Sequence, residues 1–191
     1  MRIVAGKHRG RPLQGPSGDA VRPTSDRARE SLFNILEHGK FAHGGLSPVR
    51  DVRVLDVFCG TGALGLEALS RGAAHATFLD TDPAALRIAR HNTGMLGESK
   101  NATFLQADAA HPPRADAPCA IVFLDPPYAS GLATTALTAL AAQGWLAAGA
   151  IAVVETSGRE DVTPPAAFTC VDERRYGKAK LTFLVYRTAT T

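Results

Sequence analysis

The chain has 191 residues, of which 45% are apolar and 20% charged, a composition that fits one globular domain with a buried core. Cys59, Cys119 and Cys170 are widely spaced and form no C-x-x-C pair, which argues against a disulfide framework or a zinc site and favours buried thiols in a reducing compartment. The net charge is +3, yet residues 1–30 hold seven Lys or Arg against three acids. This asymmetry suggests a nucleic-acid-binding arm, with a solvated basic tail as the alternative.

Residues 1–40 read as a basic extension in front of a domain that spans 41–191, the two together forming one compact unit. The stretches "RIVAG" and "RPL" predict a short hairpin around "KHRG". A helix should follow from about Thr24, which can cap it, to His38. No export leader is recognisable, so we expect a cytoplasmic protein.

From residue 52 onward, strands and helices alternate. The strands are expected at 52–57, 76–80, 102–106, 120–125, 150–155, 168–174 and 181–187, and the helices at 62–71, 83–96 and 131–142. The continuously apolar strands suit a parallel sheet that is buried on both faces. The last two strands have no helix between them and should form an antiparallel hairpin. We therefore predict an α/β, Rossmann-like, mostly parallel seven-stranded sheet with an antiparallel carboxyl-terminal hairpin.

The stretch from Pro126 to Val154 contains no charged residue and is long enough to suggest a membrane span. Gln143, Gly144 and Gly149 interrupt it, and Ala outnumbers Leu. We therefore interpret it as a helix, a turn and a buried strand.

Gly60, Gly62 and Gly65 follow the strand 52–57 with the spacing G-x-G-x-x-G, which is typical of a cofactor-binding turn. Asp80 lies at the end of the next strand, where a carboxylate can accept both hydroxyls of a ribose. These residues fit NAD and S-adenosylmethionine (AdoMet) equally well. A glycine-rich turn alone is a weak signal.

Two further acids favour AdoMet. Asp56 precedes the turn, where a negative charge suits the ammonium of a methionine moiety and would repel a pyrophosphate. Asp108 follows the third strand and can accept a hydrogen bond from an adenine amino group, while the Ala109 N–H can serve a ring nitrogen. Either carboxylate could instead be an ordinary cap.

The tetrapeptide Asp125, Pro126, Pro127 and Tyr128 closes the fourth strand. The prolines make a stiff corner without N–H donors, so the Asp125 carboxylate and the Pro126 carbonyl remain as acceptors beside a flat ring. This combination suits the exocyclic amino group of a nucleobase that has been unstacked or flipped. A plain Asp-Pro-Pro turn is the alternative.

The order "VLDVFCGTG", "FLDTD", "QADA" and "FLDPPY" resembles the class I AdoMet-dependent amino-methyltransferases. With "RIVAGKHRGRPL", "RPTSDRARESLFNIL" and "RYGKAKLTF", nearly the whole chain resembles the bacterial 16S ribosomal RNA guanine-N2 methyltransferase family of the RsmD type. The resemblance implies methylation of one guanine (guanine 966 of that RNA) on N2, within the assembling small ribosomal subunit, with no metal and as a monomer.

The resemblance also assigns roles to residues. The catalytic positions are Asp125, Pro126, Pro127 and Tyr128, and the AdoMet-pocket positions are Asp56, Gly60, Gly62, Asp80, Asp108 and Ala109. Arg22, Thr24 and Arg27 match the segment that packs over the methionine end of the cofactor. Cys59 and Thr61 stand where Ala and Ser are common in the family, which leaves the glycines unchanged.

Basic residues near both ends of the chain are candidate RNA contacts. Those near the amino end are Lys7, His8, Arg9, Arg11 and Arg27, which we expect to hold phosphates rather than read bases. A second patch comprises Arg174, Arg175, Tyr176, Lys178 and Lys180, but acids adjoin it, so a solvated surface is an equal alternative. Trp145 is expected in the core, and His91 and His111 on the surface or in turns.

Three other functions remain open at this stage. A DNA adenine-N6 methyltransferase is the nearest, because "DPPY" serves adenine amino groups too. A nicotinamide oxidoreductase would explain the glycines but leave "DPPY" unused. A non-enzymatic RNA-binding assembly factor would explain the basic arm but not the cofactor pocket.

Overall fold

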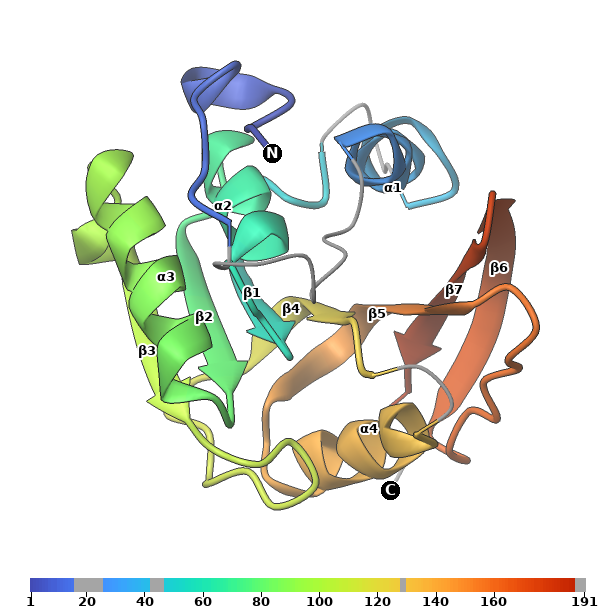
Figure 1. The fold of residues 1–191 in the computed structure, drawn as a ribbon. Coiled ribbons are helices and arrows are strands. Elements are labelled where there is room, and N and C mark those ends of the chain that lie inside the picture. The colour runs from blue at the N-terminus through green and yellow to red at the C-terminus, as the bar shows by residue number, and fades with distance from the viewer. Residues whose placement is uncertain (16–25, 42–46, 128–129, 188–191) are drawn as a thin grey trace.

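The computed structural model describes residues 1–15, 26–41, 47–127 and 130–187. Its centre is a seven-stranded sheet in the order β3-β2-β1-β4-β5-β7-β6 (Figure 1). The strands are β1 (Arg53–Val57), β2 (His75–Asp80), β3 (Ala102–Gln106), β4 (Cys119–Leu124), β5 (Leu146–Ser157), β6 (Phe168–Tyr176) and β7 (Ala179–Tyr186). The β5–β7 and β6–β7 pairs are antiparallel and the others parallel, which confirms the predicted fold class.

Helices cover both faces of the sheet. They are α1 (Asp26–His38), α2 (Ala63–Ser70), α3 (Pro83–Met95) and α4 (Leu132–Ala142), with short 3-10 turns at Gly6–His8 and Ser99–Asn101. One core lies where α1, α2 and α3 meet the sheet, and its fully buried rings are Phe33, Phe78, Phe123 and Phe183. The second core lies where α4 meets the opposite face and contains the predicted core residue Trp145, whose Nε1 donates to the Pro113 carbonyl.

Residues 1–15, here called the N-terminal arm, form the expected hairpin, though with a single β-bridge between Arg2 and Pro12. The Ile3 N–H donates to the Arg11 carbonyl at 2.9 Å, and the Gly10 N–H returns to the Ile3 carbonyl at 2.8 Å. Ile3 is fully buried, so the arm belongs to the first core even though most of its other side chains face outward.

Several local expectations need correction. β5 begins at Leu146 rather than residue 150, because Leu146 pairs with Cys119 ahead of an irregularity in the β4–β5 register. Cys59 and Cys119 are buried as expected, but Cys170 is exposed on the sheet-edge strand β6. The uncharged stretch divides into α4 and β5, and within the described residues no helix is long and apolar enough to cross a membrane.

Candidate active site

The carboxyl ends of β1, β2 and β4 bring three predicted acids to one edge of the sheet. Asp56 lies in β1, Asp80 ends β2, and Asp125 follows β4, whose strand pairs directly with β1. The Asp125 N–H reaches the Val57 carbonyl at 3.5 Å. Ligands of open α/β sheets bind at this edge, where the strand order reverses.

Residues 58–62, here called the cofactor turn, connect β1 to α2. Phe58 (φ 58°), Gly60 (φ 51°) and Gly62 (φ 77°) all take left-handed backbone angles, which glycine adopts without a steric penalty. A Cβ atom on Gly65 would lie 2.5 Å from Cε1 of Phe78. The first two glycines therefore serve the bend, and the third serves close packing of α2 on β2.

Asp56 is 2% exposed and holds the start of α2, because its Oδ2 accepts the Gly65 N–H at 2.8 Å. Burial raises the pKa of Asp56 to about 8; the Gly65 hydrogen bond opposes the shift, and the carboxylates of Asp125 and Asp80 add to it. A cation at this point would relieve the cost of ionising a buried acid. This bond is the capping role that the sequence left open as an alternative for Asp56.

Asp80 is tied to the cofactor turn. Its Oδ2 accepts the Gly60 N–H at 2.9 Å, and its Oδ1 accepts the Asp82 N–H at 2.9 Å. Each carboxylate oxygen can accept a second hydrogen bond, so these contacts leave capacity for ribose hydroxyls. Space around Gly60 is open, since its nearest neighbour for an added Cβ is the Phe58 carbonyl at 4.0 Å.

Asp108 forms the turn cap that was the alternative to an adenine contact. Its Oδ1 accepts the Ala110 N–H at 2.9 Å, and its Oδ2 lies 3.1 Å from Nδ1 of His111. These two contacts, the backbone bond first, hold the pKa of Asp108 below its usual value. The side chain is half exposed and its neighbour Ala109 is buried, so the cap leaves the outer lone pairs accessible.

The described part of the tetrapeptide continues from β4. Pro126 is buried and Pro127 is exposed, so the corner is anchored on one side and open on the other. Arg22, Thr24 and Tyr128 lie outside the described residues.

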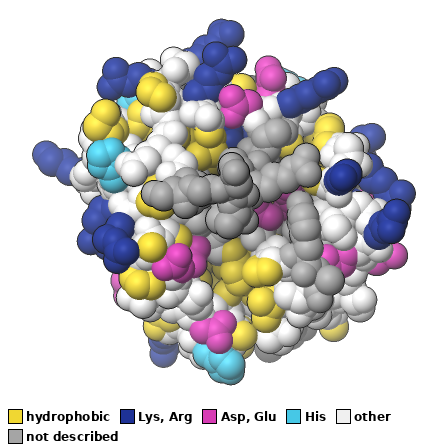
Figure 2. Space-filling model, viewed as in Figure 1, with side chains coloured by type: hydrophobic (Ala, Val, Ile, Leu, Met, Phe, Trp, Pro, Cys, Tyr) yellow, Lys and Arg dark blue, Asp and Glu magenta, His cyan; other side chains and the backbone are white. Residues whose placement is uncertain are grey.

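The candidate RNA contacts near the amino end fall into two sets. Arg9 and Arg27 line an open cleft of about 510 Å³ between the N-terminal arm and α1, together with Arg2, Asp26 and Glu30. Arg11 is exposed as well. Lys7 and His8, by contrast, both pair with the buried Glu98, at 2.7 and 2.5 Å. Figure 2 shows Lys and Arg side chains around the margin of the face seen in Figure 1.

The second basic patch is weaker than its sequence suggested. Arg174 pairs with Asp172 at 3.1 Å, Tyr176 is half-buried, and Lys178 is exposed. Lys180 is not part of the surface, because it is 2% exposed and its Nζ lies 2.6 Å from an oxygen of Asp161. His91 and His111 are exposed, as expected.

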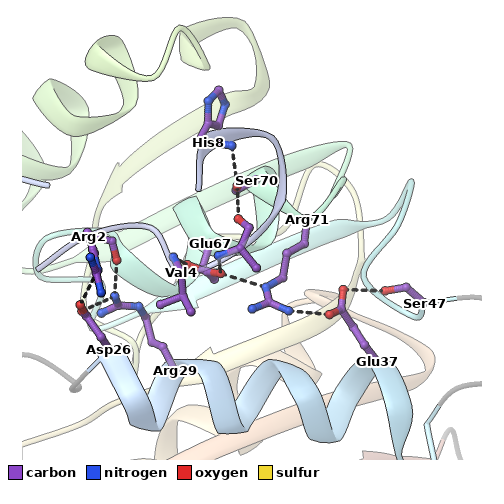
Figure 3. Close-up of polar contacts among 11 residues, drawn as sticks. Arg2, Val4, His8, Asp26, Arg29, Glu37, Ser47, Glu67, Ser70 and Arg71 are labelled. Carbon is purple, nitrogen blue, oxygen red and sulfur yellow. Dashed lines mark hydrogen bonds and ion pairs between the residues drawn. The ribbon is translucent and has the colours of Figure 1, made fainter. Parts of the chain in front are cut away.

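Two polar residues that tie the site together were not singled out from the sequence. Glu67 is fully buried on α2 and accepts the N–H groups of Val4 and Ala5 at 2.8 and 2.9 Å, with Arg71 Nε at 2.9 Å (Figure 3). Asn92 is 1% exposed on α3 and contacts both the arm and the cofactor turn. A polar side chain on the inward face of a helix was the available signal for each.

The sheet order, the glycine turn after β1 and the acids at the strand ends define the class I methyltransferase fold. The Thermus thermophilus 16S rRNA N2 G1207 methyltransferase RsmC shares this fold with a TM-score of 0.67 at 22% identity, over 90% of this chain and 45% of that one.

The particular family follows from closer matches. The family model "Conserved hypothetical protein 95" matches residues 1–185, and the chain belongs to this family. "Ribosomal RNA small subunit methyltransferase D" of Escherichia coli is 38% identical, over 93% of this chain and 86% of the relative. The solved structure of E. coli yhhF is 36% identical with a TM-score of 0.80 and 98% coverage of both chains. These matches confirm the resemblance found in the sequence and identify an enzyme of the methyltransferase class.

Proposed function

We propose that this protein transfers a methyl group from AdoMet to the exocyclic N2 amino group of guanine 966 in 16S ribosomal RNA. The observation that carries the proposal is that Asp56, Asp80 and Asp125 lie at the carboxyl ends of neighbouring strands beside one glycine turn, with a donor-free Pro-Pro corner after Asp125. The names of the relatives at 38% and 34% identity, both ribosomal RNA small subunit methyltransferase D, support the RNA substrate.

The donor set fits AdoMet. The buried Asp56 would hold the ammonium of the methionine moiety, and Asp80 the ribose hydroxyls beside the open backbone of Gly60. Asp108 and the Ala109 N–H would hold adenine, while Arg22 and Thr24 would cover the methionine end. When bound, AdoMet supplies a methyl group activated by a sulfonium. The structure of RsmC, which has the same fold, contains AdoMet and guanosine.

The corner after β4 suits the acceptor amine. The Asp125 carboxylate and the Pro126 carbonyl would accept the two hydrogens of the amine, which orients a nitrogen whose lone pair is delocalised into the base. As the new N–C bond forms, the methyl–sulfur bond breaks and the nitrogen becomes acidic. Asp125 then takes the proton or passes it to water, and Tyr128 would stack on the flipped base.

The exposed cations would bind the RNA backbone. Arg9, Arg11 and Arg27 have the exposure that phosphate contacts need, and Arg174 and Lys178 are weaker candidates. Lys7 and His8 would reach RNA only by sharing or leaving Glu98. We further propose that a cytoplasmic monomer acts on the assembling small subunit, with residues 1–40 as the RNA-binding and cofactor-covering extension.

A tritium-transfer assay tests the proposal. Labelled AdoMet would be offered with small-subunit particles that lack the modification, with naked 16S RNA and with duplex DNA. Label recovered as N2-methylguanine in RNA supports the proposal, and label only in N6-methyladenine of DNA supports the alternative, an adenine methyltransferase. Asp125→Ala should lose roughly 10²-fold or more in single-turnover rate. Asp116→Ala, which removes an exposed acid ahead of β4, is the matched control and should keep the wild-type rate.

A further inference from the structure

Asn92 joins three segments of the chain through one buried amide. Its Nδ2 donates to the Thr61 carbonyl at 3.0 Å and to the Gln14 carbonyl at 3.1 Å. Its Oδ1 accepts the Gln14 N–H at 2.7 Å. Both donor hydrogens and the carbonyl of the side chain are therefore used, and all three bonds leave α3.

The bond to Thr61 acts on the cofactor turn. The peptide group between Thr61 and Gly62 is planar, so fixing the Thr61 carbonyl also orients the Gly62 N–H, which donates to the Cys59 carbonyl at 2.7 Å. Asp80 holds the Gly60 N–H of the same turn, and Asp56 holds the Gly65 N–H just beyond it. The turn is thus held from β2 by Asp80 and from α3 by Asn92, while the start of α2 just beyond it is held from β1 by Asp56.

The two bonds to Gln14 act on the N-terminal arm. They hold one arm residue by both its N–H and its carbonyl, as a neighbouring strand would. The arm is also held on α2, where Glu67 accepts two of its N–H groups and the Ser70 hydroxyl donates to the Ala5 carbonyl (Figure 3). The arm therefore contacts the two helices that follow the cofactor turn and β2.

We propose that Asn92 is a positioning residue that keeps the cofactor turn and the N-terminal arm in one fixed relation, so that cofactor affinity depends on the arm. The inference rests on the proposed function, in which the turn binds AdoMet and the arm binds RNA. In this scheme Asn92 is not itself a ligand-binding residue. It acts through the Thr61 peptide on one side and the Gln14 peptide on the other.

Two matched pairs of variants separate this role from general packing. Asn92→Ala removes all three bonds. Thr93→Ala is its control, because the Thr93 side chain is also fully buried on α3 but donates to the Ala89 carbonyl of the same helix, at 2.7 Å. Gln14→Pro removes the N–H that reaches Asn92, whereas Gln14→Ala keeps it. The Gln14 side chain is exposed, so neither substitution removes a side chain from the core.

Calorimetric titration with S-adenosylhomocysteine (AdoHcy), thermal unfolding and steady-state kinetics would be measured on the full chain. Asn92→Ala should weaken AdoHcy binding at least tenfold, or about 1.4 kcal/mol. Gln14→Pro should weaken it by a smaller factor of about three or more, and both controls should stay within twofold of wild type. The KM for AdoMet should rise in step with the AdoHcy dissociation constant, while kcat at saturating AdoMet changes less than threefold.

The inference is overturned if folded Asn92→Ala and Gln14→Pro bind AdoHcy within twofold of wild type, or if each control weakens binding as much as its partner. Should Asn92→Ala not fold, the Gln14 pair decides alone. A wild-type protein that binds no AdoHcy would instead overturn the proposed function. The two failures are therefore distinguishable.

Discussion

Replacing Asp56 by Asn tests whether the buried carboxyl group stays protonated in the folded protein until a cationic ligand binds. The substitution keeps an acceptor for the Gly65 N–H and removes the ionisable group from a position that is 2% exposed. Because the folded pKa is raised to about 8 from 3.8, the unfolded chain releases this proton more readily than the folded chain does. The contribution of Asp56 to stability is therefore fully present below about pH 4 and is lost as pH rises toward 8.

The size of this effect on stability follows from the two pKa values, 3.8 in the unfolded chain and about 8 in the folded chain. Between pH 5 and pH 7 the unfolded acid is ionised and the folded acid is protonated, so wild type should lose about 1.4 kcal/mol per pH unit relative to Asp56→Asn. The difference between the two proteins should then change by about 2.7 kcal/mol over two units. Other titrating groups are common to both proteins and cancel in the comparison.

Urea unfolding of both proteins at pH 5, 6, 7 and 8 gives the free energies directly. Parallel curves for the two proteins would refute the reasoning, because they would mean that Asp56 ionises equally in both states. AdoHcy titrations supply the second half of the test. Wild-type affinity should rise with pH toward 8, as the acid becomes free to meet the ligand's ammonium, and the variant's affinity should be weaker and nearly flat.

Three further substitutions test the supports of the site. Gly65→Ala places a Cβ 2.5 Å from the Phe78 ring and should destabilise the protein by about 2 kcal/mol, or lower Tm by about 4–8 °C. On α3, the nearest atom to a Cβ on Gly94 is Ser99 Oγ at an ordinary contact distance of 4.0 Å, so Gly94→Ala should be neutral or stabilising, and equal Tm values for the two variants would count against the packing argument. Asp80→Ala should raise the AdoHcy dissociation constant tenfold or more, measured by calorimetry, because it removes charge-assisted hydrogen bonds of about 1.5–3 kcal/mol. An unchanged constant would show that Asp80 does not bind the ribose. Glu67→Gln should lower the free energy of unfolding by about 3 kcal/mol and speed amide exchange in the N-terminal arm, because the buried carboxylate accepts two of the arm's N–H groups. Exchange as slow as in wild type would show that the arm does not depend on this carboxylate.

Much of this architecture was readable from the sequence because local patterns and topology agree. Apolar runs located all seven strands, and the sequence placed Asp56, Asp80 and Asp125 at or near the ends of three of them, which parallel pairing brings to one edge of the sheet. The missed features depend on tertiary contacts. The place of Asn92 on the inward face of α3 indicates burial, but nothing local identifies its bonding partners, which lie 78 and 31 positions away.

The same reason explains why Lys180 does not belong to the basic patch near the carboxyl end. Lys180 follows other basic residues in sequence, but in β7 its side chain is enclosed and pairs with Asp161 and Glu173. Charge counts along a segment cannot reveal which face of a strand each residue occupies or which distant acid meets it. The burial of Lys180 depends on the pairing of β6 with β7, which exists only in the folded protein.

The strand order also constrains how the chain is made. β7 follows β5 and β6 in the chain but lies between them in the sheet, so the interior of the sheet is complete only after both have been synthesised and β7 has followed. Until β7 has left the ribosome, the outer edge of β5 has no hydrogen-bonding partner, and β6 is the wrong neighbour to cover it. Unpaired strand edges are sites of aggregation. A nascent chain stalled before residue 179 would therefore carry an open edge on β5. Pairing of the eight-residue strand β7 with β5 covers this edge and prevents it from pairing with another chain.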